Sequence, residues 1–297
     1  MNGFSASEAA LEGFRLTRER PGTIAAWSVI NFVGVTTIGG LMLASLGAPL
    51  IEYIKKGGLN SIHPEELASV LTASWPAFFG IMAVVILFLS IMTAGIFRIV
   101  LRPGEKGFAH LRLGKDEIRL SAVNLMLLPM GLVFLAIVDL VGAQVASKSG
   151  NLAGLVAAAL VAAPMVWVGV RLSLATPMTF AEHRISLKDA WGLTRGRFWP
   201  LFGMILLAVI FYIIIWALIL IIYAALTQMG GGPDNMLGAK GVGISPMAVV
   251  ILLLTLALQM ILPVLQSVMI YAPFAVAYQQ LHGDQPANPL RARMEHG

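Results

Sequence analysis

The sequence predicts an all-α, polytopic membrane protein with six transmembrane helices, and three observations carry this prediction. Of the 297 residues, 58% are hydrophobic and only 12% are charged, whereas soluble globular proteins average about 45–50% apolar and about 25% charged residues. Apolar stretches long enough to cross a bilayer recur six times, and most basic residues lie in alternate connections between them. We therefore expect a single integral membrane domain over residues 1–297.

The expected spans follow from length, because a bilayer core about 30 Å thick needs about 20 residues of apolar helix. Several stretches exceed this minimum, so tilting, kinking or extension beyond the hydrocarbon core must absorb the excess. The expected spans are Thr23–Ile51, Trp75–Val100, Ala122–Ala146, Leu152–Met178, Phe198–Thr227 and Pro246–Tyr278. Proline removes a backbone donor and crowds the preceding turn, so four prolines are natural kink positions. They are Pro49, Pro129, Pro164 and Pro263.

The distribution of lysine and arginine predicts the orientation, because cytoplasmic loops carry an excess of basic residues. Sixteen of the 20 basic residues lie near the N-terminus, in two alternate connections and near the C-terminus, and four lie on the opposite side. The sequence therefore predicts that both termini lie in the cytoplasm. The basic segments are residues 15–20, 98–119, 171–197 and 291–293.

Three cytoplasmic segments share a helix-start pattern, in which a capping residue is followed three positions later by an acid. Ser5–Glu8 and Ser186–Asp189 have serine at the capping position, and Gly114–Glu117 has glycine, which is also tolerated there. We interpret these starts as a threefold internal repeat of an interfacial amphipathic helix followed by a two-span hairpin. Chance similarity among short, biased segments is the alternative. The expected units are approximately residues 1–104, 105–182 and 183–297.

The interfacial helices predict contact with the membrane surface. In the first, Phe4, Leu11 and Phe14 can share one face while charged residues occupy the rest. Such a helix can lie in the headgroup layer, where anionic lipid attracts each basic residue by about 1 kcal/mol. The alternative is that the arginines only set the topology and extend toward lipid phosphates. The candidate headgroup-binding residues are Arg18, Arg20, Arg112, Arg195 and Arg197.

Asp139 is the one acidic residue well inside an expected span, and acids in that position are functional candidates. At 1.5 Å per residue from Ala122, it lies about 25 Å along the helix, near the outer interface. Arg171 should lie near the inner end of its span, so we expect no direct pair between the two. A hydrated aspartate at the outer edge and an ion or proton relay are the two interpretations.

Catalytic and cofactor-binding patterns are missing from the sequence. The chain has no cysteine, which excludes disulfides, thiolate catalysis and sulfur-ligated metal sites. It contains no metalloprotease helix motif, no nucleophile elbow and no phosphate-binding loop. We therefore expect no enzyme activity, no catalytic residues, no metal and no cofactor. The basic residues lie beside hydrophobic spans, so we expect no nucleic-acid partner.

A fourteen-residue segment opens the third expected unit with an aromatic and basic motif: Ser186-Leu187-Lys188-Asp189-Ala190-Trp191-Gly192-Leu193-Thr194-Arg195-Gly196-Arg197-Phe198-Trp199. It resembles a recurring element in the membrane domain attached to some bacterial glycerophosphodiester phosphodiesterases, and in related stand-alone six-span proteins. The resemblance implies a six-span architecture in the bacterial inner membrane. In the fused proteins a separate barrel domain performs hydrolysis, and we expect no such domain here, so phosphodiesterase activity does not carry over.

The leading functional hypothesis is a non-enzymatic inner-membrane protein that engages lipid headgroups, with anionic phospholipid as the favoured ligand, or a membrane-protein partner at the cytoplasmic face. The repeated arginine-bearing entries motivate it. The alternative is a small-molecule transporter with a cavity between proline-kinked spans, since interrupted helices and internal repeats are common in transporters. Threefold two-span units, however, differ from the usual inverted pair.

Overall fold

The structure, a computed structural model, describes residues 4–57, 75–105, 108–229 and 246–283. All regular secondary structure in these ranges is helical, and six helices are long and apolar enough to cross a membrane. The predicted fold class, an all-α polytopic membrane protein, is therefore confirmed. The elements are α1 (Ala6–Glu19), α2 (Pro21–Gly57), α4 (Trp75–Leu101), η2 (Phe108–His110), α5 (Lys115–Ser149), α6 (Asn151–Leu172), α7 (Ala175–Glu182), α8 (Leu187–Leu193), α9 (Phe198–Met229) and α11 (Pro246–Gly283).

The fourth expected span differs from the structure at its inner end. The sequence predicts one helix as far as Met178, but α6 ends at Leu172 and α7 begins at Ala175. Pro177 explains the break, because it gives no N–H to the carbonyl of Ser173 and its ring crowds that group. Pro129, Pro164 and Pro263, by contrast, lie inside continuous helices.

The three expected helix starts are realised differently. Ser5 caps α1, and its hydroxyl accepts a hydrogen bond from the backbone N–H of Glu8 at 3.3 Å. Gly114 caps α5 in extended conformation, but α5 then continues into the span, so the second expected interfacial helix is not separate. Ser186 caps α8 without a side-chain capping bond. The threefold repeat stays a prediction.

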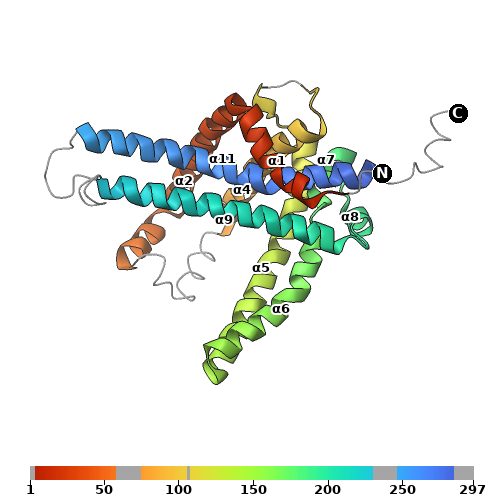
Figure 1. Ribbon diagram of the computed structural model, residues 1–297. Coiled ribbons are helices and arrows are strands. Elements are labelled where there is room, and N and C mark those ends of the chain that lie inside the picture. Colours follow the sequence, from red (N-terminus) through yellow and green to blue (C-terminus); the bar gives the residue numbers. More distant parts are fainter. Residues whose placement is uncertain (1–3, 58–74, 106–107, 230–245, 284–297) are drawn as a thin grey trace.

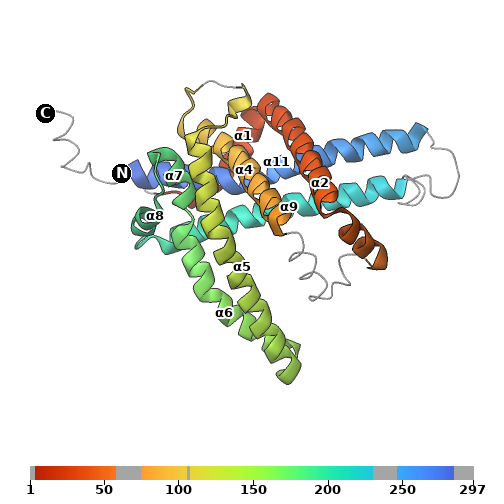
Figure 2. The ribbon, with the colours of Figure 1, turned by 180° about the vertical axis from the view of Figure 1, so that it is seen from behind.

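Helix α11 is the central element of the fold. It packs against α1, α2, α4, α7 and α9, and its C-terminal half contributes to three hydrophobic clusters. Val268 and Ala272 pack with Trp27 of α2, while Tyr278 and Leu281 pack with α1 and α9 residues. Figures 1 and 2 show the pairs α2–α4, α5–α6 and α9–α11 extending in different directions from a common region.

Helix α1 packs on α11 through small residues. Ala9, Ala10 and Gly13 are buried in α1, whereas Leu11 is 47% exposed. A Cβ at Gly13 would lie 2.8 Å from the Cα of Met269, so the two helices cross very closely. Of the residues expected to face the membrane surface, Phe14 contacts the Phe211 ring of α9 at 5.3 Å between centroids.

Small residues also join α5 to α6 into a tight hairpin. A Cβ added at Gly154 would lie 2.5 Å from the Cβ of Ala146 and 2.6 Å from the carbonyl oxygen of Gly142. One added at Gly142 would lie 3.1 Å from the Cβ of Ala158. The small residues spaced four apart in α6 therefore form a packing face, as helix pairs in membranes commonly use.

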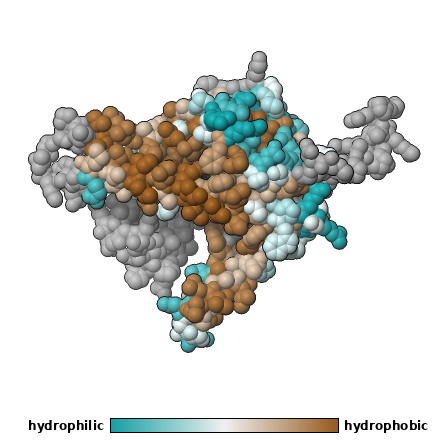
Figure 3. Space-filling model, viewed as in Figure 1, coloured by the Kyte–Doolittle hydropathy of each residue, from teal (hydrophilic) through white to brown (hydrophobic). Residues whose placement is uncertain are grey.

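Polar residues gather where the helix pairs meet. We call the region formed by residues 98–119 and 171–197 the base. Its two parts touch because α7 packs on both α4 and α5. In Figure 3 the hydrophilic surface concentrates over the end of the molecule that carries α7 and α8 and above α1, whereas α9 and α11 present a hydrophobic surface. The base therefore joins the ends of several spans that the basic residues predict to be cytoplasmic.

The close contact at Gly154 gives a first prediction. Gly154→Ala should lower the free energy of unfolding by about 1–3 kcal/mol, because the added methyl group must push two backbones apart. Gly169→Ala is the matched control on the same helix, since a Cβ there meets nothing within 4 Å. Titration with denaturing detergent, followed by circular dichroism, measures both. Equal effects of the two substitutions would contradict the packing assignment.

Candidate functional site

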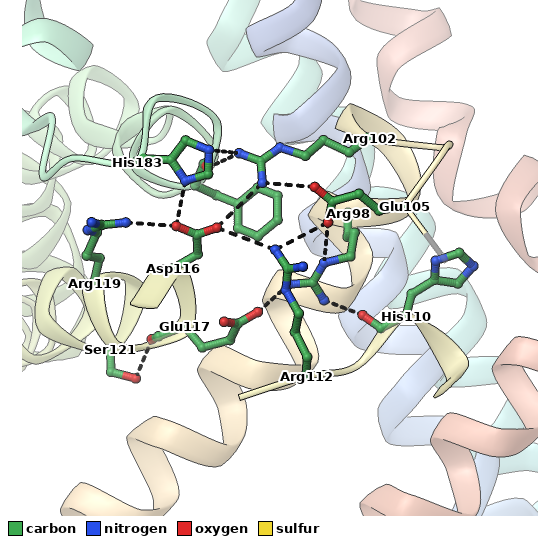
Figure 4. A network of polar contacts seen from close by, with 11 residues as sticks. Arg98, Arg102, Glu105, His110, Arg112, Asp116, Glu117, Arg119, Ser121 and His183 are labelled. Atoms are coloured by element: carbon green, nitrogen blue, oxygen red, sulfur yellow. Dashed lines mark hydrogen bonds and ion pairs between the residues drawn. The ribbon is translucent and has the colours of Figure 1, made fainter. Parts of the chain in front are cut away.

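The base contains a network of charged side chains that joins three elements, and we call it the charge network (Figure 4). It forms because two arginines lie at the end of α4 and two acids lie in the first turn of α5. The turn after α7 brings His183 into contact with residues of both groups. Four arginines face three carboxylates and one imidazole. The members are Arg98, Arg102, Glu105, Arg112, Asp116, Glu117, Arg119 and His183.

Arg98 and Glu117 form the innermost pair of this network. Arg98 is 2% exposed and Glu117 is fully buried. One terminal nitrogen of Arg98 donates to Oε1 of Glu117, and the other donates to the backbone carbonyl of His110. The Nε of Arg98 lies 3.3 Å from Oε2 of Glu105. This pair ties the end of α4, the connection and the start of α5 together.

Asp116 is the acceptor at the centre of the outer part. Its Oδ1 accepts from Nη1 of Arg119 at 2.9 Å and from Nδ1 of His183 at 2.7 Å. Its Oδ2 lies 3.5 Å from Nη1 of Arg102 and 3.7 Å from Nη2 of Arg112. Asp116 and Glu117 also occupy the first turn of α5, where carboxylates complement the positive end of the helix.

Arg102 connects the network to α7. Its Nη2 donates to the backbone carbonyl of Phe180 at 2.8 Å and to Nε2 of His183 at 3.0 Å. Its guanidinium also lies 4.7 Å from the centre of the Phe180 ring. Because Arg102 always donates, Nε2 of His183 accepts from it, and Nδ1 of His183 faces Asp116. The left-handed backbone of His183 (φ 57°) ends α7 and aims the ring at α5.

His110 links this region to α1. Its Nε2 lies 3.1 Å from Nη1 of Arg20, and the preceding carbonyl, of Ala109, accepts from the Trp27 indole at 2.7 Å. Burial lowers the pKa of His110 below its ordinary value of 6.5, and the charges of Arg20 and Arg98 lower it further. The neutral imidazole is therefore the form that accepts the Arg20 bond.

The five predicted headgroup residues divide into two groups. Arg112 belongs to the charge network and Arg20 contacts His110, so the structure places these two beside protein partners. Arg18, Arg195 and Arg197, in contrast, have no hydrogen-bond or ion-pair partner among the described residues for their guanidinium groups. Arg18 and Arg195 are exposed, and Arg197 is half-buried with its Nη1 enclosed.

Asp139 lies apart from the base, on the α5–α6 hairpin. It borders a groove of about 610 Å³ together with Asn151 and small or apolar residues of both helices. Within the described ranges, neither Arg171 nor another basic side chain pairs with it. Its role as a hydrated aspartate or as a relay stays a prediction.

Sequence reasoning missed the charge network itself. Arg98, Arg102 and Arg119 count only as topology determinants in the sequence, and Asp116 and Glu117 read as a helix start. A usable signal existed, because four arginines and three acids within residues 98–119 are an unusual density beside a span. The contribution of His183, 67 residues from Asp116 along the chain, has no local signal.

The arrangement suits binding and rigid positioning. The network's carboxylates already accept from several arginines, while the unpaired arginines offer forked donors that match phosphate oxygens. Among the described residues, no group of three or more side chains forms a metal site. No protein-family model, curated protein or solved structure matches the chain. The resemblance of residues 186–199 to the phosphodiesterase-associated membrane domain stays an expectation.

The buried pair gives a second prediction. Arg98→Met should lower the free energy of unfolding by about 3–5 kcal/mol, because it leaves Glu117 buried without a cation. The double variant Arg98→Met with Glu117→Leu should recover most of this loss, since well-packed apolar side chains replace a buried pair at little cost. Arg184→Gln is the control, because Arg184 also pairs with two carboxylates but its own side chain is exposed. Failure of the double variant to recover would contradict a simple pair.

The lowered pKa of His110 gives a third prediction. Above about pH 6.5 the imidazole is neutral in both the folded and unfolded chain, so it does not change stability with pH. Below that pH the unfolded chain takes up the proton more readily than the folded one, so stability falls on acidification. His110→Gln should flatten this part of the profile of melting temperature against pH. Identical slopes for wild type and variant would rule out the assigned contribution.

Proposed function

We propose that this chain is a non-enzymatic inner-membrane protein whose base engages the headgroups of anionic phospholipids from the cytoplasmic side. The observation that carries the proposal is the division of the arginines. The arginines of the charge network pair with carboxylates of the same network. Arg18, Arg195 and Arg197, in contrast, have no carboxylate partner among the described residues. Unpaired guanidinium groups beside membrane spans attract phosphate at about 1 kcal/mol per residue.

Aromatic and apolar side chains next to these arginines support the same proposal. Trp199 is 76% exposed and stands two residues after Arg197, and Leu11 of α1 is 47% exposed. Tryptophan concentrates at membrane interfaces because its ring is apolar and its N–H is polar. An arginine with an adjacent exposed indole is thus suited to the headgroup layer.

The proposal includes both chain ends in the cytoplasm and the threefold repeat. The alternating basic segments support the orientation. Two of the three entries, at α1 and α8, are short helices that precede a span. The repeat explains why unpaired arginines occur near both α1 and α9.

The fourth prediction tests this proposal directly. Replacing Arg18, Arg20, Arg195 and Arg197 with glutamine should reduce the ratio of phosphatidylglycerol to phosphatidylcholine retained by the purified protein several-fold. Wild type should show the enrichment, and added salt should weaken it, because exposed charges are screened. Mass spectrometry of co-purified lipid gives the ratio.

A matched control keeps the result specific. Arg15→Gln with Arg184→Gln removes two exposed cations that already pair with carboxylates, so it should leave the ratio unchanged. Correct insertion is checked by labelling single cysteines introduced at Ser7 and Ser149, since the chain has no native cysteine. An unchanged lipid ratio in a correctly inserted fourfold variant would contradict the proposed function.

A further inference from the structure

A second buried arginine lies in the base, and none of the described residues gives it an anionic partner. Arg171 sits in the last turn of α6 and is only 7% exposed. Its Nε is enclosed and has no acceptor, and no described carboxylate or carbonyl accepts from the rest of its guanidinium. A buried charge normally has a partner, because removing it from water is costly. Arg171 therefore lacks the counter-charge that Arg98 finds in Glu117.

Two tryptophans form the walls around Arg171. The guanidinium carbon lies 4.9 Å from the centre of the Trp191 ring and 5.8 Å from that of Trp167. The two indoles meet edge to face at 5.3 Å. Cation–π contact holds the guanidinium in place, but it supplies no acceptor for the N–H groups. The two indole rings thus orient the N–H donors of Arg171 and leave these donors available to a ligand.

The segment that begins α9 lies beside the end of α6. The Thr194 hydroxyl lies within hydrogen-bond distance of the carbonyl oxygen of Ala190 in its own segment, at 2.9 Å, and of that of Arg171, at 3.0 Å. The backbone N–H of Arg197 donates to the carbonyl oxygen of Thr194 at 3.2 Å. Thr194 is fully buried and so fixes the end of α6 against the segment that begins α9. The Nη1 of Arg197 is enclosed and has no acceptor among the described residues.

We infer that Arg171 forms a seat for one phosphate group, which we call the phosphate seat. Planar guanidinium groups bind phosphate through paired N–H donors, and their charge matches that of the ligand. Basic pockets between spans on the cytoplasmic side are where phosphate-bearing headgroups bind. The inference rests on the proposed function, which it deepens by naming the chemical group and a defined position for it.

The seat differs from surface attraction in a way that an experiment can separate. Exposed arginines attract anionic lipid collectively, and each removal has a similar effect. The phosphate seat depends on one buried side chain that is 93% removed from solvent and that the fourfold variant above leaves native. Arg195 is the matched control, because it is exposed, its guanidinium has no partner among the described residues, and it directly follows Thr194 in the chain.

The fifth prediction compares Arg171→Gln, Arg171→Lys and Arg195→Gln with wild type in delipidated detergent. The melting temperature is measured while inorganic phosphate, or separately phosphatidylglycerol, is added at constant ionic strength with chloride as the balancing anion. A ligand that binds the folded state raises the melting temperature with concentration. Arg171→Gln should need about tenfold more ligand for the same rise, because charged hydrogen bonds are lost.

The two ligand arms identify the source of the phosphate. A response to both ligands, or to inorganic phosphate alone, indicates a soluble phosphate compound, and a response to phosphatidylglycerol alone indicates a lipid headgroup. In every one of these cases Arg195→Gln should respond as wild type does. Arg171→Lys keeps the charge without the fork, so its response should lie between those of wild type and Arg171→Gln, which keeps the test usable if the glutamine variant does not fold.

Two results would overturn the phosphate seat. One is a wild type that responds to neither ligand more than to chloride, and the other is an equal loss of response in Arg195→Gln and the Arg171 variants. Equal loss would leave surface attraction, and with it the proposed function, intact. Conversely, a normal lipid ratio in the fourfold variant contradicts the proposed function without touching the Arg171 result, since the two readouts rest on different residues.

Discussion

The ion pair between Arg98 and Glu117 holds the base together. At the end of a membrane span, backbone groups and charged side chains need hydrogen-bond or ion-pair partners. The end of α4 places the guanidinium of Arg98 in a region with almost no water contact. Glu117 neutralises it, and the His110 carbonyl takes a second donor. Arg98 belongs to α4 and binds both the connection and α5. The other charged residues of the network are therefore arranged around a fixed position.

Composition and charge were enough to predict the spans, because the hydrocarbon core permits only long apolar helices. The helix starts at Ser5 and Gly114 could also be predicted, since helix capping depends on residues that are close together in the sequence. The break before Ala175 was missed although Pro177 signals it. The charge network was not predictable in detail, because the pairing of Asp116 with His183 depends on where α7 packs rather than on spacing.

The division between paired and unpaired arginines likewise emerges only from tertiary structure. Arg112 and Arg195 look equivalent in the sequence, as basic residues in cytoplasmic connections. In the fold, Arg112 faces Glu105 and Asp116, whereas Arg195 follows the short helix α8 with no acid in reach among the described residues. The basic residues that predict the topology therefore form two groups. One group pairs with carboxylates inside the fold, and the other is available to bind ligands.

The division between paired and unpaired arginines also holds for two buried residues, Arg98 and Arg171. Both lie at the end of a span that reaches the base, both are more than nine-tenths buried, and both lie near aromatic rings. Among the described residues, only Arg98 meets a carboxylate. Because both buried guanidinium groups demand a counter-charge, the fold supplies the anion internally for Arg98, and the phosphate seat supplies an external one for Arg171. A phosphate group satisfies that demand at Arg171 with the donor geometry already present, which makes ligand binding a consequence of how the spans end.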